Sequence, residues 1–215
     1  QVVKFIVSSV DESLKNIFKL PLGLADTTSW EKMVESKRAT PPREISSNEW
    51  SLLKKQPFVQ ILDPAAGTGT FLKHVILQIR QNLLDKWSTK TKEEIDVLWN
   101  GYVRDNLLSR IYGFQITMAP YAVCHMQIGL LLKKTNYFFD KNVRLNVFLT
   151  NTLEPSEKYT GLTLFSEFVA KESEKANQIK NKYITVVLGN PPYKGISSNS
   201  NDWIDGLLKG KITDK

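Results

Sequence analysis

The sequence has a single cysteine, only two histidines and no long apolar run among its 215 residues. One cysteine excludes an intrachain disulfide, which favours a reducing compartment such as the cytoplasm. No stretch has the length and apolarity of a membrane span, and no secretory signal is recognisable, so we expect no membrane partner. A phosphate-gripping Gly-Lys-Ser/Thr loop is also absent, which argues against a nucleoside triphosphatase.

What remains is an ordinary globular composition, with 41% hydrophobic and 24% charged residues. A chain of this length can bury a substantial core of its own. Its net charge of +7 favours anionic partners such as nucleic acid, although the lysines are dispersed and form no basic tail. The chain starts Gln1-Val2-Val3 without a methionine, and we therefore expect it to be part of a longer polypeptide.

Apolar patterning predicts strands that alternate with helices. Strands are expected at 58–62, 110–114, 145–149 and 183–188, and helices at 3–18, 71–83, 121–132 and around 165–169, with a helical insertion in 85–106. The segment 20–43 is expected to be loop, and Ser47 or Asn48 to cap a short helix over Trp50 and Leu53.

This alternation predicts an α/β fold, with a mostly parallel sheet and helices on both faces. Two parts are expected, a helical segment over 1–57 that packs on the catalytic domain and a core over 58–215.

The most informative string is Asp63-Pro64-Ala65-Ala66-Gly67-Thr68-Gly69-Thr70-Phe71, directly after the first expected strand. Gly67 and Gly69 allow a tight turn and a close approach of the backbone to a ligand. A helix follows at once, so its free N–H groups face the same place. The third glycine of the dinucleotide fingerprint is missing. A carboxylate beside a glycine turn suits a cationic or zwitterionic ligand such as S-adenosylmethionine, which has no phosphates; a tight turn without a ligand is the alternative.

A second string, Asn190-Pro191-Pro192-Tyr193, follows the last expected strand. The two prolines stiffen this turn. The amide oxygen of Asn190 and the carbonyl of Pro191 can each accept one N–H of a planar amino group. Two acceptors outside the plane of such a group draw its nitrogen toward tetrahedral geometry, so that its lone pair points at a methyl donor. The ring of Tyr193 can stack on a base, although an ordinary proline turn with a packed tyrosine would have the same sequence.

In this order, the two strings resemble the first and fourth signatures of gamma-type N6-adenine DNA methyltransferases. The likeness extends over nearly the whole chain and is strongest to large single-chain restriction–modification enzymes of Type ISP. Further segments share it: Leu22–Thr27, Ile111–Gln115, Met118–Val123 and Thr150–Glu154.

The resemblance implies a Rossmann-like S-adenosylmethionine-dependent methyltransferase fold, incomplete at both ends. It implies a cytoplasmic bacterial or archaeal enzyme that acts on double-stranded DNA with a flipped-out adenine. Target-recognition and translocase or nuclease domains of the same parent polypeptide would be its partners. Since the family's segments upstream and downstream are missing, we expect the chain alone to methylate poorly or not at all.

Carried over position by position, the resemblance assigns a cofactor site and a catalytic site, with no metal. The catalytic residues are Asn190, Pro191, Pro192 and Tyr193, and the cofactor residues are Asp63, Pro64, Ala65, Gly67, Gly69, Gln115, Ile116 and Asn151. Two positions depart from the family's pattern, because Gln115 stands where an acid usually binds the ribose and Asn151 where an Asp is frequent. Asn151 either reads the cofactor's adenine or is a turn residue at the end of a strand.

Other candidates for chemistry have plainer explanations. Cys124 is expected to be a small buried hydrophobe and not a catalytic thiol, since no activating partner is evident. His74 is expected to be a packed or surface histidine, and His125 beside Cys124 gives too few ligands for zinc. The polar residues that follow Tyr193, among them Lys194, contact DNA phosphates or form a solvated loop.

Three functions are consistent with these motifs. Methyl transfer to adenine in DNA is the first, and the same chemistry on RNA adenine or on a protein glutamine amide is the second. The third is an inactive scaffold or DNA-binding module.

Overall fold

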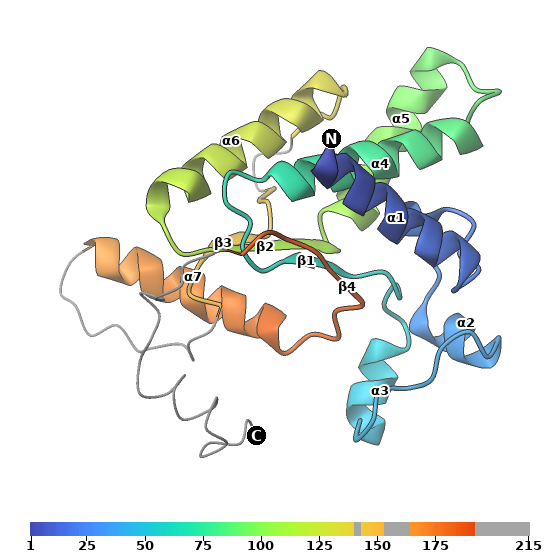
Figure 1. Cartoon of the computed structure of the whole chain (residues 1–215), viewed down its shortest axis with the longest axis horizontal. Coiled ribbons are helices and arrows are strands. Elements are labelled where there is room, and N and C mark those ends of the chain that lie inside the picture. Colours follow the sequence, from blue (N-terminus) through green and yellow to red (C-terminus); the bar gives the residue numbers. More distant parts are fainter. Residues whose placement is uncertain (140–142, 153–163, 192–215) are drawn as a thin grey trace.

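A computed structural model describes residues 1–139, 143–152 and 164–191 of the chain (Figure 1). Its centre is a four-stranded sheet in the order β3-β2-β1-β4, in which every neighbouring pair is parallel. The strands are β1 (Ile61–Asp63), β2 (Ile111–Gln115), β3 (Val147–Leu149) and β4 (Val186–Val187).

Helices make up most of the remaining described structure. They are α1 (Val2–Asn16), α2 (Trp30–Glu35), α3 (Ser47–Leu53), α4 (Thr70–Lys86), α5 (Lys92–Tyr102), α6 (Met118–Lys134) and α7 (Leu164–Lys180), with a short 3-10 turn at Gly23–Ala25 and a π-helical turn at Val103–Leu107.

Helices cover both faces of the sheet, as the alternation of elements predicts. Figure 1 shows α4 and α6 over one face and α7 over the other, with α1 lying along α4. On the α7 side, Ala176 and Ile179 pack against Phe114 and Phe148 of the strands. The strands are short but almost fully buried, which fits the apolar runs from which they were predicted. The predicted α/β class is therefore confirmed.

The register places the ends of the strands at one edge of the sheet. Asp63, the last residue of β1, lies opposite Gly113, and Gln115 at the end of β2 lies opposite Leu149. On the other side, β4 pairs with β1, and the N–H of Leu188 donates to the carbonyl of Leu62 at 3.0 Å. The glycine string and the Asn-Pro-Pro-Tyr string therefore follow adjacent strands.

Several predicted boundaries need correction. The strands predicted at 58–62 and 183–188 are shorter than expected. Strand β1 begins only at Ile61, since Phe58 and Val59 are buried ahead of the hydrogen-bonded ladder. Strand β4 spans only two residues. The segment 20–43 is not only loop. It contains α2, whose first turn is capped by the Ser29 hydroxyl.

The cap of α3 also differs from the prediction. Ser46, and not Ser47 or Asn48, is its N-cap, and it forms a reciprocal capping box with Glu49. A Ser followed three residues later by Glu is the signature of this motif, so the sequence did contain the signal.

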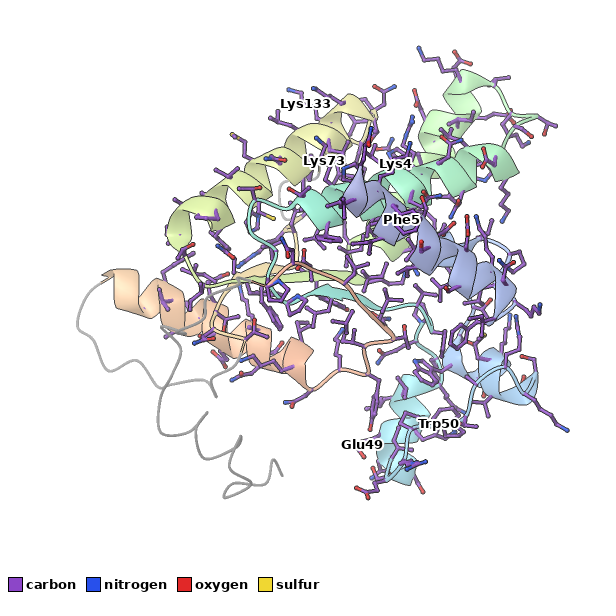
Figure 2. The ribbon with its side chains drawn as sticks, in the orientation of Figure 1. Lys4, Phe5, Glu49, Trp50, Lys73 and Lys133 are labelled. Carbon is purple, nitrogen blue, oxygen red and sulfur yellow. The ribbon has the colours of Figure 1, made fainter. Side chains whose placement is uncertain are left out.

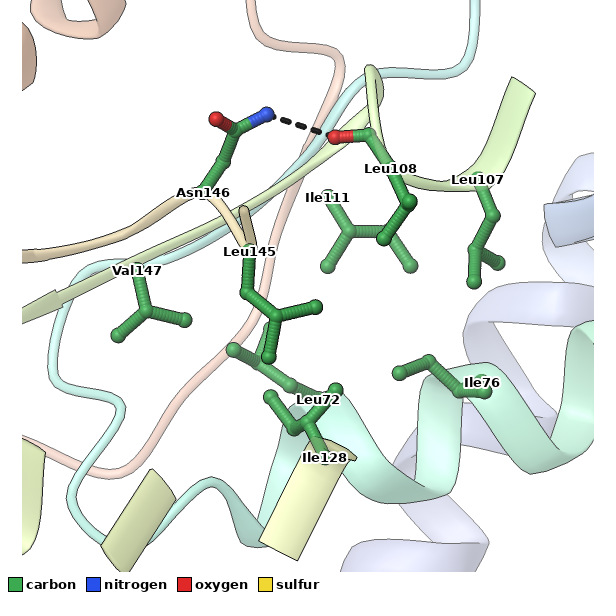
Figure 3. Close-up of a pocket in the computed structure, with 9 residues that line it drawn as sticks. All are labelled: Leu72, Ile76, Leu107, Leu108, Ile111, Ile128, Leu145, Asn146 and Val147. Atoms are coloured by element: carbon green, nitrogen blue, oxygen red, sulfur yellow. Dashed lines mark hydrogen bonds between the residues drawn. The ribbon is translucent and has the colours of Figure 1, made fainter. Parts of the chain in front are cut away.

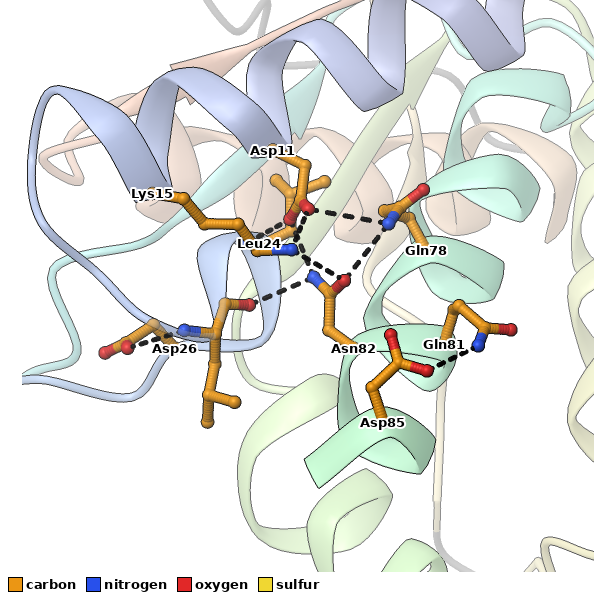
Figure 4. A network of polar contacts seen from close by, with 9 residues as sticks. Asp11, Lys15, Leu24, Asp26, Gln78, Gln81, Asn82 and Asp85 are labelled. Atoms are coloured by element: carbon orange, nitrogen blue, oxygen red, sulfur yellow. Dashed lines mark hydrogen bonds and ion pairs between the residues drawn. The ribbon is translucent and has the colours of Figure 1, made fainter. Parts of the chain in front are cut away.

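A buried polar cluster fixes α1 to α4 (Figure 4). Oδ1 of Asp11 accepts hydrogen bonds from the backbone N–H of Leu24 at 2.8 Å and from Nδ2 of Asn82 at 2.7 Å. Its Oδ2 forms an ion pair with Lys15 at 2.7 Å and accepts a long hydrogen bond from Gln78 at 3.4 Å. The N-terminal helix is thus attached to the core through one saturated carboxylate. The division of the chain at residue 57 remains a prediction.

A small apolar cavity lies between the sheet and helices α4 and α6 (Figure 3). Its volume is about 20 Å³, enough for one water-sized group, so it is a packing gap and no cofactor site. It is lined by Leu72, Ile76, Leu107, Leu108, Ile111, Ile128, Leu145, Asn146 and Val147.

Basic side chains are spread over the surface. Figure 2 shows Lys4 on α1, Lys73 on α4 and Lys133 on α6, so three different helices contribute them. Across the described ranges, no helix has both the length and the apolarity to span a membrane.

Candidate functional site

The carboxyl edge of the sheet gathers most of the predicted site residues. Asp63 ends β1 and Gln115 ends β2, while Asn151 follows β3 and Asn190 follows β4. In an open parallel sheet, ligands bind beyond this edge. The four strand ends therefore bring together residues that are up to about 130 positions apart in the sequence, as the parallel topology requires.

The glycine loop has the tight geometry that its sequence predicts. Gly67 and Gly69 both have positive φ, +55° and +88°, and Gly69 caps the N-terminus of α4. The N–H of Gly69 donates to the carbonyl of Ala66 at 2.7 Å, and the N–H of Ala66 donates to the carbonyl of Phe114 at 2.9 Å. The loop is thereby curled back on itself and tied to β2.

Helix α6 supports this loop from behind. A Cβ at Gly69 would lie 2.7 Å from Sγ of Cys124, so only glycine allows this approach. Cys124 is fully buried, and burial together with the nearby Asp63 charge raises the pKa of its thiol to about 12. The thiol is therefore protonated at neutral pH and packs as an apolar group, as predicted.

Asp63 is the most unusual charged group at this edge. Its side chain is 1% exposed, and Oδ1 accepts a hydrogen bond from the N–H of Ala65 at 3.0 Å. Oδ2 is buried as well and has no hydrogen-bond partner among the described residues. Burial raises the pKa of this carboxyl to about 6. A buried carboxylate oxygen without a donor is costly, so a group that donated to this atom would stabilise the folded protein.

The segment after β3 reaches across to the glycine loop. Oγ1 of Thr152 donates to the carbonyl of Pro64 at 2.6 Å, and the N–H of Thr150 donates to the carbonyl of Gln115 at 2.9 Å. Asn151 lies between them and is half-buried. The loop at Pro64 and the ends of β2 and β3 therefore form one connected surface.

Gln115 and Ile116 lie at the exposed end of β2. Nε2 of Gln115 donates to Oγ1 of Thr117 at 2.8 Å, which leaves the amide oxygen as the acceptor that the side chain can offer to a ligand. Ile116, the first residue after β2, is 53% exposed. An acceptor beside an open apolar side chain suits a nucleoside.

The segment after β4 brings the second motif to the glycine loop. Gly189 is half-buried against the carboxyl of Asp63, and Asn190 and Pro191 are exposed. Pro192 and Tyr193 lie outside the described residues, so their predicted roles stay predictions. The structure thus brings together Asp63, the glycine loop, Gln115, Asn151 and Asn190 at one edge.

The two histidines lie away from this chemistry. His74 lines a groove of about 330 Å³ between α1 and α4, and partial burial together with Lys73 and Lys4 lowers its pKa. Nε2 of His125 lies 3.2 Å from the carbonyl of Val147, and its ring packs on Tyr121. No group of potential metal ligands occurs in the ranges that the structure describes.

Sequence reasoning missed two contributors to the site. The sequence presents Thr152 only as part of a family-like segment, although its hydroxyl donates a hydrogen bond to the carbonyl of Pro64. Gly189 was not singled out, although it separates β4 from Asn190 and touches Asp63. A glycine directly before a rigid proline turn was the available signal.

Comparison with known proteins supports the fold. The chain resembles in structure the "ATP-dependent Type ISP restriction-modification enzyme LlaBIII bound to DNA", with a TM-score of 0.61 and 22% identity over 97% of this chain. It also resembles a nuclease-deletion mutant of the Type ISP enzyme LlaGI in complex with a DNA substrate mimic (TM-score 0.59, 23% identity, 94% of this chain) and the DrdV–DNA complex (TM-score 0.52, 22% identity, 92% of this chain).

These likenesses support the fold, and the chain spans only 12 to 14% of the length of those proteins. No curated protein matches the chain in sequence. The family model described as N-6 DNA Methylase matches residues 36–207, which is most of the chain and includes both strings. The resemblance drawn from the two motifs is therefore confirmed, and the chain belongs to the N-6 DNA methylase family.

Proposed function

We propose that this chain transfers a methyl group from S-adenosylmethionine to the N6 amino group of adenine in DNA, as the modification part of a restriction–modification enzyme. The observation that carries the proposal is the contact between Gly189 and Asp63. This contact joins the glycine loop, which we propose as the cofactor site, to the segment that begins with Asn190, which we propose as the amino-group acceptor.

The residues present fit the cofactor. The unpartnered Oδ2 of Asp63 can accept a hydrogen bond from its ammonium group, with charge assistance once the carboxyl is ionised. The glycine loop leaves room for its chain, and the N-terminus of α4 offers N–H groups to its carboxylate. The amide oxygen of Gln115 can accept from a ribose hydroxyl, and Ile116 and Asn151 can contact its adenine. Bound there, the cofactor supplies an electrophilic methyl group on sulfur.

The residues after β4 would hold the amino group that is methylated. Oδ1 of Asn190 and the carbonyl oxygen of Pro191 would each accept a hydrogen bond from one of its two N–H groups. This would turn the lone pair of the nitrogen toward the cofactor loop. No covalent intermediate with the protein is needed, because positioning and electrostatics carry the reaction. The amino nitrogen would form its bond to the methyl carbon as the bond from that carbon to sulfur breaks, and it would then lose one N–H proton to water. Tyr193 would stack on the base and contribute about 1–3 kcal/mol, which helps to hold an adenine that is rotated out of the duplex.

DNA is the favoured substrate for two reasons. The chain belongs to a DNA methylase family, and the similar structures include enzymes described as bound to DNA. A net charge of +7 adds a general attraction to nucleic acid. Since the similar proteins are several times longer, we propose that target recognition and DNA translocation or cleavage belong to other parts of the parent polypeptide.

Methyl transfer by the parent polypeptide tests the proposal. Incorporation of labelled methyl groups would be measured on adenine-containing DNA, on RNA of the same sequence and on a glutamine-containing peptide, with mass spectrometry of the product nucleosides. We expect N6-methyladenine in the DNA. Modification of RNA or peptide alone would assign the second function considered above.

Asn190→Ala identifies the acceptor site. We expect it to lower the transfer rate by about 100-fold or more while cofactor affinity changes little, because the lost contact acts on the amino group. Asn48→Ala, on the exposed first turn of α3, is the matched control and should leave both unchanged. A chain that binds no S-adenosylmethionine in a calorimetric titration would point to an inactive scaffold.

A further inference from the structure

The contact between Gly189 and Asp63 is closer than any side chain allows. A Cβ at position 189 would lie 2.5 Å from Oδ1 of Asp63 and 3.4 Å from both its Cγ and Cδ of Pro64. Among the described glycines, positive φ occurs only at Gly23, Gly67 and Gly69, so backbone conformation does not demand glycine at 189. The requirement at this position is steric.

The carboxyl group of Asp63 cannot easily move away. Its side chain is short and buried, and Oδ1, the atom that a Cβ would meet, accepts the hydrogen bond from the N–H of Ala65. Rotation of this carboxyl would break the bond that shapes the start of the glycine loop. The other way to relieve the clash is to move the segment after β4 away from β1, and Asn190 would move with it.

We propose that Gly189 is a positioning residue that sets the separation between the cofactor loop and the amino-group acceptor Asn190. Its missing side chain lets the segment after β4 pass directly over the Asp63 carboxyl. This inference rests on the proposed function, because it assigns to the glycine the spacing between the methyl donor and the methyl acceptor. In-line transfer needs such spacing to within a fraction of an ångström.

Gly189→Ala tests the inference in combination with a substitution that makes room. Asp63→Ser shortens the side chain at 63 and keeps a hydroxyl oxygen that can accept from the N–H of Ala65. The wild type, the two single variants and the double variant form a cycle. Gly101→Ala is the matched control, since a Cβ at this position on α5 would meet nothing within 4 Å.

Two quantities are measured on the chain itself, the dissociation constant for S-adenosylmethionine and the melting temperature. We expect Gly189→Ala to weaken cofactor binding by about tenfold or more and to lower the melting temperature, because overpacking strains the Asp63 carboxyl and pushes the segment after β4 away from the cofactor loop. In the Asp63→Ser background the same change should alter the dissociation constant less than about twofold, since the coupling partner is gone. Gly101→Ala should not weaken binding in either background.

A third quantity separates positioning from simple destabilisation. In the parent polypeptide, at saturating cofactor and at a temperature where the variant is folded, the transfer rate of Gly189→Ala should fall by about tenfold or more, because Asn190 is displaced. An unchanged saturating rate would overturn the positioning role.

Further results of the cycle bear on the role of Gly189. Equal effects of Gly189→Ala in both backgrounds, or no effect in either, would overturn the inference. If Gly189→Ala does not fold, the double variant must fold for the inference to stand. If the wild type binds no S-adenosylmethionine, the proposed function fails, and the cycle of melting temperatures still tests the contact.

Discussion

Asp11 and Asp63 are both buried carboxylates that lie beside a glycine, and their surroundings are opposite. Asp11 is 2% exposed and both of its oxygens are engaged, by Leu24, Asn82, Lys15 and Gln78. Asp63 is 1% exposed, and one of its oxygens has no donor in the part of the chain that the structure describes. The first attaches a helix to the core, and the second lies where the strands end.

The difference shows how one residue type serves two purposes. A buried carboxylate whose oxygens all accept hydrogen bonds can stabilise the fold, because each donor offsets part of the free-energy cost of removing the carboxylate from water. A buried carboxylate that lacks a donor destabilises the folded protein until a ligand supplies one. This is why we propose Asp63 as a binding group, and substitutions at the two positions should have opposite consequences for stability.

The largest effect is expected from Asp11→Ala. It leaves the Leu24 N–H without its acceptor. The Lys15 ammonium and the Asn82 amide each lose one of two acceptors and keep the other, Oδ1 of Asn82 and the carbonyl of Leu22 respectively. We expect a loss of about 3–5 kcal/mol in the free energy of unfolding, measured by denaturant titration. Asp85 is an exposed carboxylate on α4 that accepts a hydrogen bond only from Gln81 among the described contacts. Asp85→Ala should change the free energy of unfolding by less than about 0.5 kcal/mol. Equal losses in the two variants would contradict a structural role of the cluster.

The next effect is a pH dependence that belongs to Asp63. Because burial raises the pKa of Asp63 to about 6, the folded state holds its proton where the unfolded state has lost it. The contribution of this group to stability is fully present below its unfolded pKa, near 4, and is lost as the pH rises through its folded pKa of about 6. The free energy of unfolding of the wild type, minus that of Asp63→Asn, should fall by about 2 kcal/mol between pH 4 and pH 7. A flat difference would show that Asp63 ionises normally.

A smaller effect is expected on ligand binding. Asp63→Asn keeps an oxygen for the N–H of Ala65 but replaces the free carboxylate oxygen by an amide nitrogen. At pH 7 we expect affinity for S-adenosylmethionine to fall by about 10- to 100-fold, the value of one charge-assisted hydrogen bond, while the protein becomes more stable. Calorimetry measures the affinity. Asp85→Ala is again the control, and unchanged affinity in Asp63→Asn would remove Asp63 from the site.

The smallest effect should follow Gln78→Ala. This side chain donates to Asp11 over 3.4 Å, and Asp11 keeps its three shorter contacts without it. We expect a loss below about 1 kcal/mol in the free energy of unfolding and normal cofactor affinity. A loss as large as that of Asp11→Ala would mean that the cluster depends on every member.

The strand, turn and helix around Asp63 could be predicted from the sequence. The apolar run before Asp63, the two glycines and the helix from Thr70 are contiguous, so their pattern predicts a strand, a turn and a helix. The strand before Asn190 was likewise visible as a β-branched run. The alternation of elements was sufficient for the α/β class and for placing both motifs at one edge.

The contacts between residues far apart in the sequence could not be predicted. Asp11 and Asn82 are 71 residues apart, and neither the pairing of their side chains nor the saturation of Asp11 leaves a local pattern. The contact of Gly189 with Asp63 depends on the parallel pairing of β4 with β1, which only the folded sheet establishes. For the same reason, the burial that perturbs Asp63 could not be inferred from the string in which it lies.

The pKa of Asp63 with and without the cofactor tests most directly whether this carboxylate binds S-adenosylmethionine. Carboxyl ¹³C NMR of the chain, assigned with Asp63→Asn, would follow this group through a pH titration. We expect a pKa near 6 in the free protein and a clearly lower pKa when S-adenosylmethionine is bound, because its ammonium stabilises the ionised form. A pKa that stays near 6 in the complex would contradict the assignment of Asp63 as the group that binds the cofactor.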